Sequence, residues 1–250
     1  MNTPASLGGL LARSLTLAAL TMLGGCQLLS APSAPPYKRI AWEHAQPGCI
    51  QHCPLINVET LHYHDEPLLN AEIERRLLGL ADPDQQFPQA DSLLAFERSF
   101  LPTAEPAWAN YLQAKQRDAH GSILVVELSS YLDRGGAHGA PGRGFINYDR
   151  ASKRLLSLEE VLLPGQEHAF WQVAAQAHKA WLTRNELDQD ADFQSQWPFK
   201  PTEHVALLAD KLLLKYDVYA IAPYSSGHPE ITIDYPALKG VLKSEFLPGM

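Results

Sequence analysis

The residues best suited to chemistry lie in a glycine-rich stretch, residues 135–144, which also contains His138 and Pro141. Because the pKa of histidine lies near neutrality, His138 could act as a general base or contact a polar partner. The alternative is that its ring hydrogen-bonds the backbone of its own loop and holds the turn. No nucleophile or carboxylate pair accompanies His138 at a recognisable spacing, so we favour the second interpretation.

A second group of aromatic and small polar residues surrounds Pro223. Such side chains on a loop suit the recognition of carbohydrate or protein. The alternative is a turn whose tyrosines complete the hydrophobic core. We predict one binding surface from the two stretches, provided that they lie side by side. Its candidate residues are Gly136, His138, Gly139, Tyr224, Ser225 and His228.

A catalytic alternative pairs His138 with Asp149 as the acid and base of a hydrolase. Asp149 also suits a turn, because its carboxylate can accept hydrogen bonds from nearby backbone N–H groups. His62 and His64 would share one face of a strand, as a metal site could use, but a polar strand end explains them more simply. We therefore predict no catalytic residue, no metal and no cofactor.

Strands and helices must position these residues. Alternation of apolar residues predicts strands at 55–64, 121–132, 144–148, 155–156, 204–208, 212–216, 218–222 and 231–234. Apolar spacing predicts helices over 91–115, with a break near 102–106, over 167–185 and at 236–242. Capping residues predict one helix that has Asp65 as its cap and ends at Asp82, and another that begins at the capping box of Ser157. The expected fold class is α+β, a mainly antiparallel β-sheet with helices packed on it.

The N-terminus has the features of a secretory signal peptide, with Arg13 before a short apolar run and small residues before Cys26. The sequence ending in Cys26 resembles the bacterial lipobox, in which the cysteine is lipidated; the alternative is an ordinary secretory peptide. We predict a signal peptide over 1–25 and a lipidated, Pro-rich tether over 26–36. Gln27 follows Cys26 in place of an aspartate, which in a Gram-negative host implies an outer-membrane lipoprotein facing the periplasm.

Cys49 and Cys53 are the only cysteines after Cys26. In an oxidising compartment an isolated pair predicts a disulfide, whereas a zinc or redox site would lack a second pair of ligands. The formal net charge of −8 argues against nucleic acid as a partner and is compatible with a cationic one.

Three groups of residues occur together in order: 136–139 with 147–149, then 155–162, then 219–227 with 231–235. In this arrangement the chain, over about 55–242, resembles the RsiV-like extracytoplasmic domain, a family that includes the accessory domain of the peptidoglycan deacetylase PdaC and many bacterial lipoproteins. The resemblance implies an α+β domain with a role in binding at the cell wall. The RsiV-like part would be 119–250, packed with 37–118 as one unit.

RsiV is an anti-sigma factor and PdaC is a deacetylase. We expect neither the segment that the first activity needs nor the catalytic domain of the second in this chain, so these activities do not carry over. We predict a cell-envelope lipoprotein, attached to the lipid bilayer through acylated Cys26. Its periplasmic domain would bind a lysozyme-type hydrolase or peptidoglycan without catalysis. The alternative is a hydrolase that modifies cell-wall glycan with His138 and Asp149.

Overall fold

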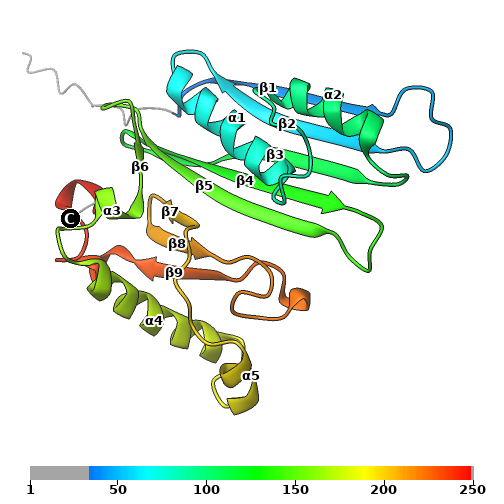
Figure 1. Ribbon diagram of the computed structural model, residues 1–250. Helices are drawn as coiled ribbons and strands as arrows, with labels where there is room; N and C mark the ends of the chain where they lie inside the picture. Colours follow the sequence, from blue (N-terminus) through cyan, green and yellow to red (C-terminus); the bar gives the residue numbers. More distant parts are fainter. Residues whose placement is uncertain (1–33, 249–250) are drawn as a thin grey trace, which may run out of the picture. The chain divides into compact units, whose positions relative to one another are not determined.

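Two β-sheets and the helices that cover them make up residues 34–248, the part of the chain that this computed structural model describes (Figure 1). The larger sheet has the order β1-β2-β3-β4-β5-β6. Its strands are β1 (Tyr37–Ala45), β2 (Leu55–Tyr63), β3 (Ala109–His120), β4 (Ile123–Asp133), β5 (Ala140–Asp149) and β6 (Arg154–Leu156). Neighbours are antiparallel except β2 and β3, which are parallel because a long helical crossover connects them.

That crossover contains α1 (Pro67–Ala81) and α2 (Leu93–Thr103). Leu69, Ile73 and Leu77 of α1 are buried at helical spacing and belong to one apolar cluster with residues of β2, β3, β4 and β5. The predicted cap at Asp65 is wrong, because Glu66 occupies the cap position without a side-chain hydrogen bond. The amide of Asn70 instead bonds both the N–H and the C=O of Tyr63, which joins the helix directly to β2.

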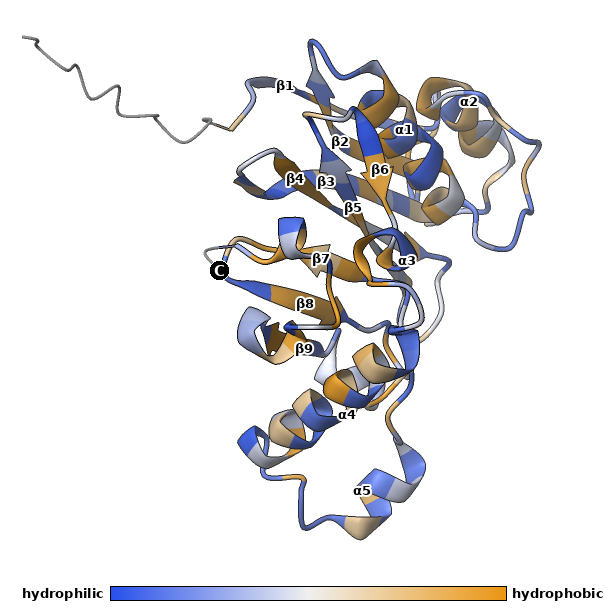
Figure 2. Cartoon of the chain, turned by 90° about the vertical axis from the view of Figure 1, so that its left-hand side faces the viewer, coloured by the Kyte–Doolittle hydropathy of each residue, from blue (hydrophilic) through white to orange (hydrophobic). Residues whose placement is uncertain are grey.

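The smaller sheet is antiparallel and consists of β7 (Val205–Leu207), β8 (Lys211–Lys215) and β9 (Glu230–Asp234). One apolar cluster joins it to Val125 and Phe145 of the large sheet and to Phe170 and Ala174 of α4 (Glu167–Arg184). Figure 2 shows the hydrophobic residues concentrated along β7 and β8. The remaining short helices are α3 (Leu158–Val161), α5 (Ala191–Gln196), η1 (Tyr224–Ser226), η2 (Tyr235–Leu238) and η3 (Ser244–Phe246).

A buried amide side chain adds a polar link between the two sheets. Asn147 of β5 donates to Val205 O at 2.8 Å and accepts from Leu207 N at 2.9 Å. Its amide therefore satisfies one carbonyl and one N–H group of the β7 backbone, as the backbone of a neighbouring strand would. This contact fixes the smaller sheet against the larger one, and with it the loops that follow β8.

The predicted fold class is confirmed: the fold is α+β, with a mostly antiparallel large sheet. Three further local predictions are wrong. Residues 109–115 form part of β3 and are not helical, 218–222 form turns and no strand, and β5 begins at Ala140, earlier than the predicted residue 144. Strand β1 was not predicted, because its side chains are mostly exposed and give no apolar alternation.

The predicted disulfide between Cys49 and Cys53 is present in the connection between β1 and β2. Within residues 34–248, no helix is both long and apolar enough to cross a membrane. The predicted signal peptide, Cys26 and most of the tether lie outside the described residues.

Candidate functional site

The connection between β4 and β5 is a tight loop whose shape depends on glycine. Gly135 has a positive φ of 75° and its N–H donates to Asp133 Oδ1. A Cβ on Gly139 would lie 2.5 Å from Cζ of Tyr131 and 2.9 Å from Leu132 O, so a side chain cannot fit there without displacing its neighbours. The Tyr131 hydroxyl accepts from Gly139 N at 3.0 Å. The glycines therefore let the loop fold back onto β4.

The connection between β8 and β9 forms the other half of the site. Tyr219 has a φ of 65°, an unusual conformation for a bulky residue that marks local backbone strain. Tyr224 begins the short helix η1, and Gly227 ends it with a positive φ and an N–H bond to Tyr224 O. This loop projects its tyrosines toward the loop between β4 and β5.

The two loops are in direct contact, as the predicted surface requires. The rings of His138 and Tyr224 stack with centroids 3.9 Å apart, and His138 Nε2 lies 3.2 Å from the Tyr219 hydroxyl. The Tyr224 hydroxyl donates to Gly139 O at 3.2 Å. Desolvation and the nearby Tyr131 raise the pKa of Tyr224.

Further aromatic residues extend this contact into a surface. Tyr131 and Tyr111 are paired across β3 and β4, with centroids 6.4 Å apart, and Trp197 stacks against Tyr219. The exposed fractions of Tyr111, Tyr131 and Tyr219 are 40%, 37% and 51%. The aromatic surface, as the term is used below, consists of Tyr111, Tyr131, His138, Trp197, Tyr219 and Tyr224. Sequence reasoning missed Tyr111, Tyr131 and Trp197, because their proximity depends on strand register and on the end of α5.

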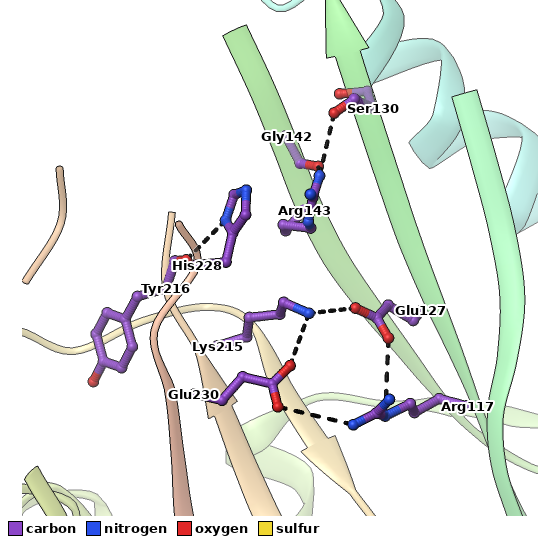
Figure 3. A network of polar contacts seen from close by, with 9 residues as sticks. All are labelled: Arg117, Glu127, Ser130, Gly142, Arg143, Lys215, Tyr216, His228 and Glu230. Atoms are coloured by element: carbon purple, nitrogen blue, oxygen red, sulfur yellow. Dashed lines mark hydrogen bonds and ion pairs between the residues drawn. The ribbon is translucent and has the colours of Figure 1, made fainter. Parts of the chain in front are cut away.

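The other predicted residues have different roles. Gly136 and Ser225 are exposed beside the aromatic surface, whereas Gly139 is buried and contributes the shape of the loop and its backbone hydrogen bonds with Tyr131 and Tyr224. His228 is partly buried, and its Nδ1 lies 3.0 Å from Tyr216 O (Figure 3). Desolvation, reinforced by Arg143, lowers the pKa of His228, so the ring is neutral near neutral pH. His228 therefore supports the connection between β8 and β9 through its contact with Tyr216 O.

Beneath the loops, a group of four charged residues links the sheets (Figure 3). Lys215 of β8 is buried and donates to Glu127 at 2.5 Å and to Glu230 at 2.9 Å. Arg117 lies 3.8 Å from each of these carboxylates. Because the buried cation is shared by two carboxylates, its charge is compensated. This group holds the strands that carry the aromatic surface in place.

His138 and Asp149 are not brought together. Residue 140, close to His138, pairs with Leu132, while Asp149 pairs with Ile123 at the opposite end of the same hairpin. Desolvation acts to raise the pKa of Asp149, but hydrogen bonds from Ser122, Ser152 and the backbone outweigh it and hold the pKa below its usual value. Asp149 thus caps its own turn, and the acid–base pair that a hydrolase would need is not assembled.

Within residues 34–248, no group of three or more histidine, cysteine, aspartate or glutamate side chains is placed to hold a metal ion. The two loops present aromatic rings and hydroxyl groups together at the surface, an arrangement that suits the recognition of a ligand. None of the described contacts activates a nucleophile.

The fold and sequence define the family. A family model described as "Protein of unknown function (DUF3298)" matches residues 159–236. A DUF3298 family protein from Pseudomonas aeruginosa PAO1, known from its crystal structure, is 54% identical, with 87% of this chain and 99% of that chain covered and a TM-score of 0.83. This chain belongs to the DUF3298 family.

A DUF3298 member from Bacteroides fragilis NCTC 9343 shares the fold, with 17% identity, a TM-score of 0.68 and coverage of 86% of this chain and 96% of that chain. Among curated proteins, none shows a significant match to this chain. The family is therefore shown, and the function has to be argued from the site.

Proposed function

We propose that this protein is a cell-envelope lipoprotein whose DUF3298 domain binds a wall-associated ligand without catalysis. The observation that carries the proposal is the contact between the two loops, in which His138 stacks on Tyr224 and bonds Tyr219. It builds one exposed aromatic surface from two separate sheets. Among wall ligands, the surface favours peptidoglycan glycan, with a lysozyme-type hydrolase as the other candidate.

The preference for glycan rests on the chemistry of the surface. Tyrosine and tryptophan provide rigid rings that bury apolar area at a low cost in conformational entropy, and the hydroxyl groups of tyrosine add hydrogen bonds. Sugar rings offer the matching combination of C–H faces and hydroxyl groups. A cationic lysozyme would instead be attracted by the net charge of −8, which favours the rate of encounter more than affinity.

A hydrolase is not proposed. His138 Nε2 faces the Tyr219 hydroxyl and its Nδ1 lies 3.3 Å from Gly139 O, so both ring nitrogens are engaged within the loops. Asp149 lies at the far end of the hairpin. The histidine is best understood as the residue that fastens one loop to the other.

The envelope location is part of the proposal. A signal peptide over 1–25, an acylated Cys26 and a tether over 26–36 would attach the domain to the outer membrane, facing the periplasm. The disulfide between Cys49 and Cys53 fits an oxidising compartment. The resemblance to the RsiV-like and PdaC accessory domains supports a role at the cell wall.

A binding titration tests the function. Residues 37–250 would be purified, since the crystallised relative spans a similar length, and titrated with soluble peptidoglycan fragments and with lysozyme at low and high salt. Saturable, salt-insensitive binding of fragments supports the glycan; salt-sensitive binding of lysozyme supports the hydrolase partner. No saturable binding of either at low salt overturns the proposal.

A matched pair of variants locates the ligand. Tyr111→Ala removes an exposed ring of the aromatic surface, whereas Tyr37→Ala removes a ring of similar exposure, 46% against 40%, at the beginning of β1. Binding through the aromatic surface predicts weaker affinity for Tyr111→Ala and unchanged affinity for Tyr37→Ala. Equal effects of both variants would place the ligand elsewhere.

A further inference from the structure

A pocket of about 220 Å³ lies beside β5, between α1 and the segment that leads into β7. It shares no residue with the aromatic surface. Its lining is rich in arginine, although the chain as a whole is acidic. The polar residues that line the pocket are Arg75, Arg76, Arg143, Glu203 and His204, and Gly144 of β5 lines it as well.

The pocket is open because β5 lacks a partner along most of one edge. Strand β6 pairs only with residues 147–149 of β5. Within the described chain, residues 140–146 therefore have β4 on one side and no strand on the other. Gly144 lines the pocket, and a Cβ there would meet its nearest neighbour at 3.9 Å. The absence of a side chain at Gly144 leaves the strand accessible from this side.

Arg143 of β5 is one of the residues that line the pocket. Its Nη1 donates to Gly142 O at 2.7 Å and to Ser130 O at 3.2 Å (Figure 3). Within residues 34–248, no carboxylate forms an ion pair with it, and its Nε and Nη2 donate no hydrogen bond. Desolvation lowers the pKa of Arg143, against the opposing influence of Glu127 and Asp217. A partly buried cation without a bound anion is unfavourable.

Two more guanidinium groups are held at the same pocket. Arg75 and Arg76 both bond Glu72, at 2.7 and 2.6 Å, and Arg76 Nη1 also donates to Phe145 O at 2.9 Å. The bond to Phe145 places Arg76 against the open edge of β5. Planar guanidinium groups fixed in this way match the oxygen atoms of a carboxylate or a phosphate.

We propose that this pocket binds an anionic group, a carboxylate or a phosphate, with Arg143 as its principal donor and with Arg75 and Arg76 at its side. The anion supplies the direct ion pair that Arg143 lacks within residues 34–248, where Glu127 and Asp217 act on it only from a distance. The proposal does not rest on the function of the aromatic surface, and either can fail without the other.

The test is an NMR titration of residues 37–250 with sodium phosphate and, separately, with sodium acetate at constant pH and ionic strength. We expect saturable shifts of the backbone amides of Arg143, Gly144 and Phe145 with at least one anion. The anion that binds more tightly shows whether the site prefers a phosphate or a carboxylate. No saturable shift with either anion would overturn the proposal.

Variants decide whether Arg143 is the donor. Arg143→Gln should weaken binding at least about tenfold, since a hydrogen bond to a charged group is worth about 1.5–3 kcal/mol. Arg154→Gln is the control, because it makes the same change of charge on β6, where Arg154 bonds Glu160. Unchanged affinity in Arg143→Gln, or an equal loss in Arg154→Gln, would contradict the assignment.

Should Arg143→Gln fail to fold, Arg75→Gln decides. The Arg75 side chain is 67% exposed and Arg76 remains bonded to Glu72, so Arg75→Gln should still fold, with a small loss of thermal stability, and should bind the anion several-fold more weakly. An Arg75→Gln variant that folds and binds the anion as tightly as the unmodified chain would reject the site.

Discussion

The imidazole of His138 and the phenol ring of Tyr224 stack face to face, with centroids 3.9 Å apart and planes inclined by 19°. His138 lies in the connection between β4 and β5 of the large sheet, and Tyr224 in the connection between β8 and β9 of the small one. Elsewhere the sheets meet through apolar side chains, the amide of Asn147 and the charges around Lys215. The stacked pair is where they present one common surface to solvent.

Replacing His138 with alanine removes the ring pair with Tyr224 and the bond to Tyr219. The connection between β8 and β9 is then no longer held in the geometry of the aromatic surface, so binding of peptidoglycan fragments should weaken by about 3- to 10-fold. The free energy of unfolding should fall by about 0.5–1.5 kcal/mol, the energy of the lost ring pair. Isothermal titration and urea denaturation measure the two effects.

The control for this change is His168→Ala, since His168 is exposed on α4 and bonds Gln172. It should alter neither affinity nor stability. Full affinity in His138→Ala would mean that the stacked pair plays no part in the binding surface.

Gly139→Ala should lower the free energy of unfolding by about 1–3 kcal/mol, the usual effect of forcing extra volume into a packed site. The new Cβ would lie 2.5 Å from a ring carbon of Tyr131 and 2.9 Å from the backbone oxygen of Leu132. The backbone oxygen cannot move aside as a flexible side chain could. Urea denaturation followed by circular dichroism measures the loss.

Gly136→Ala provides the comparison within the same loop. Its Cβ would meet its nearest neighbour, the backbone oxygen of His138, at 3.7 Å, which is ordinary contact. We expect a change within about 0.5 kcal/mol. Equal destabilisation by the two substitutions would show that loop flexibility, and not the approach to Tyr131, decides the requirement for glycine.

Local chemistry made much of this fold predictable. The capping box of Ser157 and Glu160 is formed as expected, because its hydrogen bonds join residues close in sequence. The helix predicted over 91–115 extends too far because Tyr111 and Leu112 are large apolar residues that continue its pattern. In β3 they point to opposite faces, Tyr111 exposed and Leu112 buried. Pairing with β2 and β4 overrides the local preference there.

The site was predictable only in part for the same reason. His138 and Tyr224 were suggested by loop composition, which is a local signal. Tyr131 and Tyr111 became part of the surface through cross-strand register, and Arg143 became a pocket residue because β6 is short. These relations depend on partners distant in the sequence, so no single stretch contained them.

Asn147→Ala should destabilise the protein by about 2–4 kcal/mol, since it leaves two backbone groups, Val205 O and Leu207 N, without their hydrogen bonds at a buried position. Asn57→Ala is the control, because the amide of Asn57 bonds Glu43 at an exposed position; it should change stability by less than about 0.5 kcal/mol. A loss below about 0.5 kcal/mol in Asn147→Ala, as small as that expected of the control, would mean that the link between the sheets is energetically unimportant.

Glu59 should contribute to the acid sensitivity of the fold. A hydrogen bond from Arg39 Nε to Glu59 Oε1, 2.7 Å long, is the main reason that the pKa of Glu59 falls from 4.5 to about 2. Because the folded pKa is the lower one, this contribution to stability is complete above pH 4.5 and is lost as the pH falls toward 2. Arg39 is 62% exposed, so solvent screening limits the contribution to about 1 kcal/mol or less.

Urea denaturation at pH 5 and pH 2.5 tests this assignment, because pH 5 lies above the ordinary pKa of 4.5 and pH 2.5 lies close to the folded-state pKa of about 2. Glu59→Gln removes the titrating group, so the difference in stability between the two pH values should become smaller than in the unmodified chain. Glu105→Gln, at an exposed glutamate, should leave the difference as it is. The carboxyl carbon of Glu59 followed by NMR gives the pKa directly, and a value near 4.5 would show that Arg39 does not hold the carboxylate in solution.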